Sequence, residues 1–429
     1  MSRVLWATGA FLLLATTARG QEPSVQIPPV ERKPYSVGGI LEARPAMIWF
    51  DTNAAPFKLQ PEDARDARSA LLNSRAQLDA TYRRGWLSAQ IRAVVEAAHT
   101  SGNWTGGATA YEAFLSLKPA PSLTVDAGKK TLKWGKGYLW NPAAFLDRVK
   151  NPEDPALALE GFTVLSADYI RTFGGPLQVI SVTPVLLPVF GDLNQAFGEG
   201  GHVNVAGKLY LLFYDTDVDV MFLSGGSRAG RFGFDVSRNL RSNLELHGEW
   251  TRIAHAVTPV LGSTDTLELR EQAATSVVLG LRYLTPGNTT FIADYFRSGA
   301  GYASEEIGTY FELIERGYDS FTRAGDDRLL TLARRASEAG YGRLHPMRDY
   351  VYGRVSQPDA LGVLYLTLGG SAIVNVDDGS YTVLPEVQYR PTENLELRWL
   401  ANIQRGGSAT EFGEKPGNLR LELRIRYYF

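Results

Sequence analysis

The sequence predicts an all-β fold, a transmembrane antiparallel up-and-down β-barrel of about eighteen strands, with sixteen as the alternative count. Three observations predict it. The chain ends on a strand with one apolar and one charged face, and short turns alternate with mostly longer connections. Beyond the N-terminal segment, no apolar run is long enough for a membrane-spanning helix. We also expect short helices in some connections and one connection that folds into the barrel.

The last strand, 418–429, is the clearest signal. Successive side chains of a strand point to opposite faces, so Leu419 to Phe429 alternate between an apolar face and a charged one. A strand of this kind that ends on an aromatic residue resembles the closing strand of Gram-negative outer-membrane barrels. The resemblance implies that Tyr427 and Phe429 belong to a signal read by the barrel-assembly machinery.

The chain begins with the pattern of a signal peptide, residues 1–20. Arg3 precedes an apolar run from Val4 to Ala15, and small residues stand near Gly20. Residues 21–35 contain four prolines and are interpreted as an extended periplasmic lead-in. The barrel is expected over 36–429, in the outer membrane of a Gram-negative bacterium after signal-peptide cleavage.

Alternating segments separated by Gly, Pro, Asn or Asp turns predict the hairpins of the barrel. The expected strands are 37–50, 77–82, 89–97, 113–118, 123–133, 162–173, 177–189, 205–214, 218–223, 232–240, 244–250, 277–283, 291–296, 350–355, 361–374, 381–389, 395–404 and 418–429. The long connections are expected at 51–67, 134–159, 190–202, 254–273, 298–347 and 405–417. Helical patterns at 61–74 and 326–340 predict helices within connections.

Composition excludes several classes of site. The chain has no Cys, which excludes disulfides, Cys-ligated zinc, iron–sulfur clusters and covalent c-type haem. A net charge of -2 provides no basic footprint for nucleic acid. We expect no nucleic-acid partner, no bound metal and no cofactor.

Charged side chains on the barrel strands must face the lumen, because an Arg or Lys facing lipid at mid-depth costs about 2–4 kcal/mol. Such a ladder could select solutes by charge, or it could only brace the wall through cross-strand pairs. The predicted lumenal residues are Arg92, Glu96, Glu386, Arg390, Glu396, Arg398, Arg420, Glu422, Arg424 and Arg426.

The segment from Trp134 to Pro142 predicts a rigid excursion, because two Gly, a Pro and three aromatic residues interrupt any strand pattern. Its Trp-Gly-x-Gly-x-x-Trp-Asn-Pro run resembles a group of proteobacterial porin-like barrels and, more distantly, alginate-export-type porins. The resemblance implies an inward-folded loop. The residues expected to narrow the lumen are Trp134, Lys136, Tyr138, Trp140 and Asn141. The alternative is a fixed turn that packs Trp134 and Trp140 at the membrane interface.

The predicted function is a porin-like channel for small hydrophilic solutes, with outer-membrane lipid and the assembly machinery as further partners. No enzyme motif is present, since the five His form no metal cluster and no Gly-x-Ser-x-Gly elbow occurs. One rival is a barrel that serves as sheath or docking subunit of an envelope export or electron-transfer complex. The other is an outer-membrane hydrolase that uses His247.

Overall fold

The computed structural model describes residues 33–61, 66–100, 102–155 and 157–429. The predicted signal peptide and nearly all of the predicted lead-in, residues 1–32, lie outside the described residues. The barrel belongs to the unit Tyr35–Phe429.

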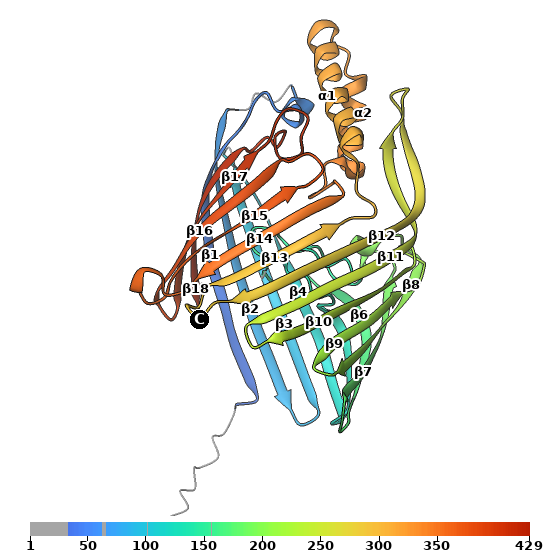
Figure 1. Ribbon diagram of the computed structural model, residues 1–429, viewed down its shortest axis with the longest axis vertical. Helices are drawn as coiled ribbons and strands as arrows, with labels where there is room; N and C mark the ends of the chain where they lie inside the picture. The colour runs from blue at the N-terminus through green and yellow to red at the C-terminus, as the bar shows by residue number, and fades with distance from the viewer. Residues whose placement is uncertain (1–32, 62–65, 101, 156) are drawn as a thin grey trace, which may run out of the picture. The chain divides into compact units, whose positions relative to one another are not determined.

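Eighteen antiparallel strands form the wall, which confirms the predicted count (Figure 1). Each strand pairs with its neighbours in sequence, and β1 pairs with both β2 and β18, so the sheet is closed. The strands are β1 (Tyr35–Trp49), β2 (Arg68–Arg84), β3 (Leu87–Thr100), β4 (Asn103–Ala120), β5 (Leu123–Lys130), β6 (Phe162–Thr172), β7 (Leu177–Val189), β8 (His202–Phe213), β9 (Thr216–Leu223), β10 (Arg231–Arg241), β11 (Leu244–Leu261), β12 (Leu267–Leu284), β13 (Thr290–Arg297), β14 (Asp349–Gln357), β15 (Leu366–Asn375), β16 (Tyr381–Thr392), β17 (Leu395–Arg405) and β18 (Leu419–Tyr428).

Tight turns at one end of the barrel follow the chemistry of hairpin loops. The β8–β9 turn has Tyr214 and Asp215, both with positive φ (48° and 56°), as a two-residue type I′ turn requires. The β2–β3 turn contains Gly85 at φ 60°, a conformation that costs glycine nothing. The opposite end carries the long connections and both α-helices (Figure 1).

The outer face of the wall is apolar and the inner face is charged. On β17 and β18, Trp399, Leu421 and Ile425 are exposed on the outside. Between them along β18, Glu422 and Arg424 are buried toward the interior. This facing agrees with the alternation read from the sequence.

One segment predicted as a helix and one predicted as a connection are in large part strand. The helix expected at 61–74 is wrong from Arg68 onward, because residues 68–74 belong to β2 and pair with β1 and β3; residues 62–65 of that segment lie outside the described residues. The loop expected at 254–273 is wrong as well, since β11 and β12 continue as a paired hairpin up to Leu261 and Leu267. Cross-strand hydrogen bonds outweigh local helix or loop propensity in both places.

The connection between β13 and β14 contains α1 (Ser304–Ala324) and α2 (Arg328–Ala336). The helix expected at 326–340 is confirmed as α2, and α1 was not predicted. Among the described residues, no helix is both long and apolar enough to cross a bilayer. Buried residues of both helices, such as Ile314 and Ala333, pack into one apolar cluster with Tyr302 and Tyr341.

Candidate functional site: the lumenal loop

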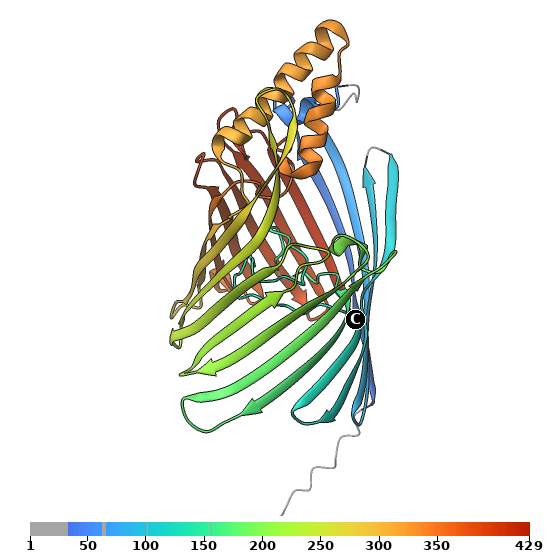
Figure 2. The same cartoon turned by 90° about the vertical axis from the view of Figure 1, so that its right-hand side faces the viewer.

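The connection between β5 and β6 lies inside the barrel over its described residues, 131–155 and 157–161, and we call it the lumenal loop. It leaves the wall after Lys130 and returns at Phe162. In between, its residues contact β11 and β13 and then β17 and β18, which are distant parts of the wall. Figure 2 shows its irregular trace within the ring of strands.

The first anchor of the lumenal loop is Glu249 on β11. Its carboxylate accepts hydrogen bonds from the backbone N–H groups of Lys136 (2.6 Å), Gly137 (2.7 Å) and Ala143 (3.0 Å). It also accepts one from the side-chain amide of Asn141 at 3.1 Å. A carboxylate fits this position because it offers about four acceptor sites and no donor. One buried side chain therefore fixes the fold of residues 136–143.

Asp294 on β13 continues this anchor. Its Oδ2 accepts hydrogen bonds from the backbone N–H groups of Tyr138 (3.0 Å) and Leu139 (3.3 Å). Its Oδ1 lies 3.1 Å from His247 Nε2 on β11. This approach requires Gly280 on β12, because a Cβ there would lie 2.1 Å from His247 Nε2 and 2.5 Å from Asp294 Oδ1. A small residue in the wall thus permits a polar anchor in the lumen.

The loop is also held by its own side chains. Asp147 accepts hydrogen bonds from the backbone N–H groups of Leu132, Lys133 and Trp134 at 3.0, 3.1 and 2.9 Å. Lys150 Nζ donates to the carbonyls of Gly137 and Tyr138 at 2.8 and 3.0 Å. These bonds satisfy backbone groups that no strand ladder reaches.

The two Trp residues of the loop are core residues. Trp134 is 3% exposed and packs with residues of β6 to β9, and Trp140 is 8% exposed and stacks on Phe296 at 5.1 Å. Trp140 Nε1 donates to His345 Nδ1 at 3.2 Å. The alternative that these rings pack at the membrane interface is wrong, because the loop carries both into the barrel. Little of either ring is left exposed to stack on a solute.

The second anchor joins the loop to the opposite part of the wall. Glu153 accepts two hydrogen bonds from Arg420 on β18, at 3.0 and 3.1 Å, and one from Asn402 on β17 at 3.1 Å. Asp154 forms an ion pair with Arg424, and Arg398 and Arg426 lie within 3.7 and 3.6 Å of it. The lumenal loop is therefore fixed at both sides of the channel.

Eight of the predicted ladder residues meet around this second anchor. Carboxylates of the wall share the same arginines, for example Glu42 of β1 with Arg426 at 2.6 Å and Glu422 with Arg424 at 3.2 Å. Arg390, which is half-exposed, pairs with Glu396 at 2.7 Å. The group that the structure brings together is Glu386, Arg390, Glu396, Arg398, Arg420, Glu422, Arg424 and Arg426.

Arg92 and Glu96 lie apart from that group, on β3. Arg92 bridges Asp79 of β2 at 2.6 Å and Glu112 of β4 at 3.1 Å. Glu96 lies 3.4 Å from Arg75 and stays half-exposed. Of the two, only Arg92 lines the cavity beside the lumenal loop.

That cavity has a volume of about 720 Å³, and its lining has more basic than acidic side chains. It is lined by loop residues between Thr131 and Leu159, by Arg92 and by residues of β13 and the connection before β14. Within the described residues, no carboxylate lies at ion-pair distance from Lys133, Lys150 or Arg343, which also line it. Asp147 is the one carboxylate among the described residues that line it, so the three cations outnumber it. The cavity is therefore cationic.

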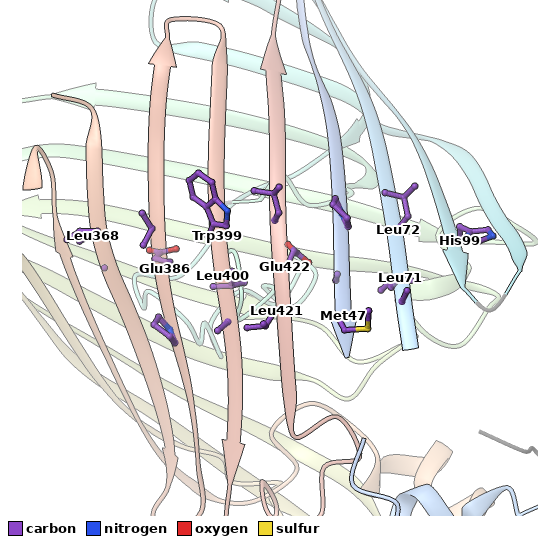
Figure 3. Close-up of a pocket in the computed structure, with 18 residues that line it drawn as sticks. Met47, Leu71, Leu72, His99, Leu368, Glu386, Trp399, Leu400, Leu421 and Glu422 are labelled. Atoms are coloured by element: carbon purple, nitrogen blue, oxygen red, sulfur yellow. The ribbon is translucent and has the colours of Figure 1, made fainter. Parts of the chain in front are cut away.

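A larger groove of about 970 Å³ lies on the outside of the wall, across β15 to β3 (Figure 3). Apolar side chains such as Met47, Trp399 and Leu421 line it. It faces the apolar surroundings of the barrel, so it offers nothing to recognise a hydrophilic solute. We place the candidate site in the lumen for that reason.

Sequence reasoning missed the anchoring roles of Asp147, Glu153, Asp154, Glu249 and Asp294. A single signal pointed to them, the presence of acidic residues within and opposite a segment that has many unpaired backbone N–H groups. Their partners lie 13 to 270 residues away in sequence. Only the closed wall brings them into contact.

A search against protein-family models found no match, and neither did a search of curated proteins. Solved structures do match. A BenF-like porin from Pseudomonas fluorescens Pf-5 is 12% identical, with a TM-score of 0.55 over 92% of this chain and 98% of its own. Pseudomonas aeruginosa OpdQ is 11% identical, with a TM-score of 0.52 over 93% and 99%.

Pseudomonas aeruginosa OccK2 (OpdF), solved in complex with glucuronate, is 10% identical, with a TM-score of 0.51 over 92% of this chain and 98% of its own. None of these results tests the resemblance of the Trp-Gly motif to its group of barrels, which stays a prediction. At such low identity the matches show the architecture of the chain and not its solute. The chain has the fold of the bacterial outer-membrane porins to which it is similar.

Proposed function

We propose that this protein is an outer-membrane channel for small hydrophilic solutes and that it favours anions. The observation that carries the channel is the pairing of an apolar outer face with a charged lumen that the lumenal loop narrows from within. A wall exposing rows of Leu, Ile, Val and aromatic residues is unstable in water and stable in hydrocarbon. A lumen lined by charges is suited to hydrated solutes.

The preference for anions rests on the cationic cavity beside the lumenal loop. Most lumenal arginines are neutralised by carboxylates at close range, so they contribute little net field. Lys133, Lys150 and Arg343 carry the surplus positive charge. Low-dielectric walls focus such a field and raise the local concentration of anions. The glucuronate bound by OccK2 is a solute of this chemical class.

The test is ion selectivity in a planar bilayer. We expect the reversal potential of the purified barrel in a KCl gradient to show preference for chloride. Liposome swelling should be faster with glucuronate than with a neutral or cationic sugar of the same size. Lys133→Gln should reduce the anion preference, because the side chain of Lys133 is exposed in the cavity and has no ion-pair partner among the described residues.

Lys118→Gln is the matched control, since Lys118 is exposed at the opposite, short-turn end of β4. It should leave the reversal potential unchanged. Purified barrel that is folded but does not conduct would refute the channel. A conducting barrel that prefers cations, or that responds equally to the two substitutions, would refute only the role of the cavity.

A further inference from the structure

The upper part of β4 has a partner strand on one side only. From Asn103 to Glu112 it pairs with β3, whereas its pairing with β5 extends from Ala113 to Ala120. Figure 2 shows β3 and β4 rising together at the edge of the wall, without a strand beside β4. Residues 103–110 are exposed throughout. This stretch of β4 is a free sheet edge, which we call the β4 edge.

The lumenal loop is the cause of this gap. β5 ends at Lys130 because the chain turns into the lumen there, and it returns to the wall only at Phe162. The register Lys130↔Phe162 marks the top of the β5–β6 pair. On the side of β4 away from β3, Gly161 N donates to Tyr111 O at 2.9 Å, next to the end of the 103–110 stretch. The insertion that narrows the channel therefore leaves the wall incomplete.

The outward face of this hairpin suits hydrocarbon. The register places Val95 opposite Ala108, and His99 opposite Trp104, on the same face as Ile91. Val95 and Ile91 are exposed on the outside, and the rings of His99 and Trp104 pack at 4.8 Å near the tip. An apolar strand face that ends on a Trp is the pattern of a lipid-facing segment with an interfacial aromatic residue.

An open sheet edge is not stable beside lipid, because each unpaired N–H or C=O group costs several kcal/mol there. The β4 edge also lacks the usual protection, since residues 103–110 (Asn-Trp-Thr-Gly-Gly-Ala-Thr-Ala) contain no charge and no Pro. The projecting part of β12, in contrast, carries Glu268, Arg270 and Glu271.

We propose that the β4 edge binds an extended segment of another polypeptide, which adds to the wall as one more strand. The partner segment is uncharged, with small or apolar residues on its lipid side and polar residues on its lumenal side, to continue the alternation of β4. This inference goes beyond the channel function and rests on the membrane position proposed above.

A second copy of this chain does not fit the β4 edge. Two copies in one membrane are related by a two-fold axis along the membrane normal, and barrel strands tilt from that normal by about 35–45°. The two β4 edges would therefore cross and could not form a continuous ladder of hydrogen bonds. The partner is therefore a different polypeptide, as in strand addition to sheet edges elsewhere.

Hydrogen exchange of the backbone amides tests the proposal. We compare the protein in native outer-membrane vesicles with the purified barrel in lipid nanodiscs. About half of the amides of residues 103–110 point away from β3, as in any antiparallel pair. These should exchange at least about tenfold more slowly in the native membrane than in the purified barrel. Residues 267–275, the charged edge of β12, should exchange equally in both.

The variant Thr105→Lys with Thr109→Lys places two charges on the edge and should abolish the protection in native vesicles. Both residues lie on the lumenal face of β4, where Lys is not placed in hydrocarbon, so flotation with lipid should be unchanged. Fast exchange in both preparations, or slow exchange already in the purified barrel, would overturn the proposal. Conductance and flotation with lipid are measured on the same samples and test the proposed channel. A barrel that fails these two assays refutes the channel, whereas fast exchange of the β4 edge in a barrel that passes them refutes only the partner strand.

Discussion

At the scale of single residues, substitution of Glu249 is expected to affect both stability and conductance. Glu249→Gln replaces an acceptor-only carboxylate by an amide whose NH₂ group would face the N–H groups of the lumenal loop. Hydrogen bonds to a charged group each contribute about 1.5–3 kcal/mol, so we expect a loss of about 3 kcal/mol in unfolding free energy. Conductance should rise because the loop loosens. Urea titration in lipid and bilayer recording measure the two effects, with the exposed Glu271→Gln on β12 as control.

The buried side chain of His345 is a second single-residue feature, and we expect it to make the stability of the protein depend on pH. Burial, with nearby Lys415, lowers the pKa of His345 to about 3 from 6.5, and its neutral Nδ1 accepts the Trp140 hydrogen bond. The imidazole of His345 therefore takes up a proton at a higher pH in the unfolded chain than in the folded chain. The stability from neutral His345 is therefore complete above pH 6.5 and declines as the pH falls toward 3.

We accordingly expect a looser loop and higher conductance at about pH 4 than at about pH 7. His345→Gln keeps an acceptor for Trp140 without a titrating group, so it should flatten this response. An identical pH response of wild type and His345→Gln would assign the effect to other groups.

At the scale of elements, the closing seam depends on the C-terminus. Phe429 N donates to Gly39 O at 3.2 Å, and Gly39 N donates to Phe429 O at 3.0 Å. The Phe429 ring packs on Gly39, where a Cβ would lie 2.6 Å from it. Deleting Phe429 should therefore lower the amount of heat-modifiable barrel in the outer membrane, whereas Phe429→Tyr should assemble normally. Normal assembly of the deletion would argue against both the seam contact and the assembly signal.

The lumenal loop carries the second prediction at this scale. Replacing residues 136–154 by a short Gly-Ser link removes both anchors and should raise conductance and admit larger solutes. The control shortens the β11–β12 hairpin by joining Ala256 to Gln272, which are paired, through an Asn-Gly turn. That change lies outside the lumenal loop and should affect conductance less. Equal conductance before and after excision of the loop would favour a docking role for it.

At the scale of the whole molecule, the two faces of the wall should respond to substitution for different reasons. Leu423→Arg puts a guanidinium into lipid at a cost of about 2–4 kcal/mol. Alternation alone predicts that Arg424→Leu is milder. The structure predicts a similar or larger cost, about 3–5 kcal/mol, because Glu42, Glu422 and Asp154 would lose a buried partner. Unfolding titrations in lipid decide between these expectations, with the exposed Arg83→Leu as control.

The sequence by itself determined the architecture of the barrel. Each predicted strand corresponds to an observed one, because a period of two in polarity, with turn residues between segments, is a local property. Strand ends were less accurate, and 68–74 and 254–273 were misassigned, since their strand character comes from pairing with β1 and β3 or within the β11–β12 hairpin.

Only the tertiary structure decided what the charges do. Alternation placed Arg398, Arg420 and Arg424 in the lumen but could not show that Glu153 and Asp154 of the lumenal loop neutralise them. It also could not show that the same loop leaves the β4 edge unpaired. These properties depend on distances between residues far apart in the chain, and such distances exist only after the wall has closed.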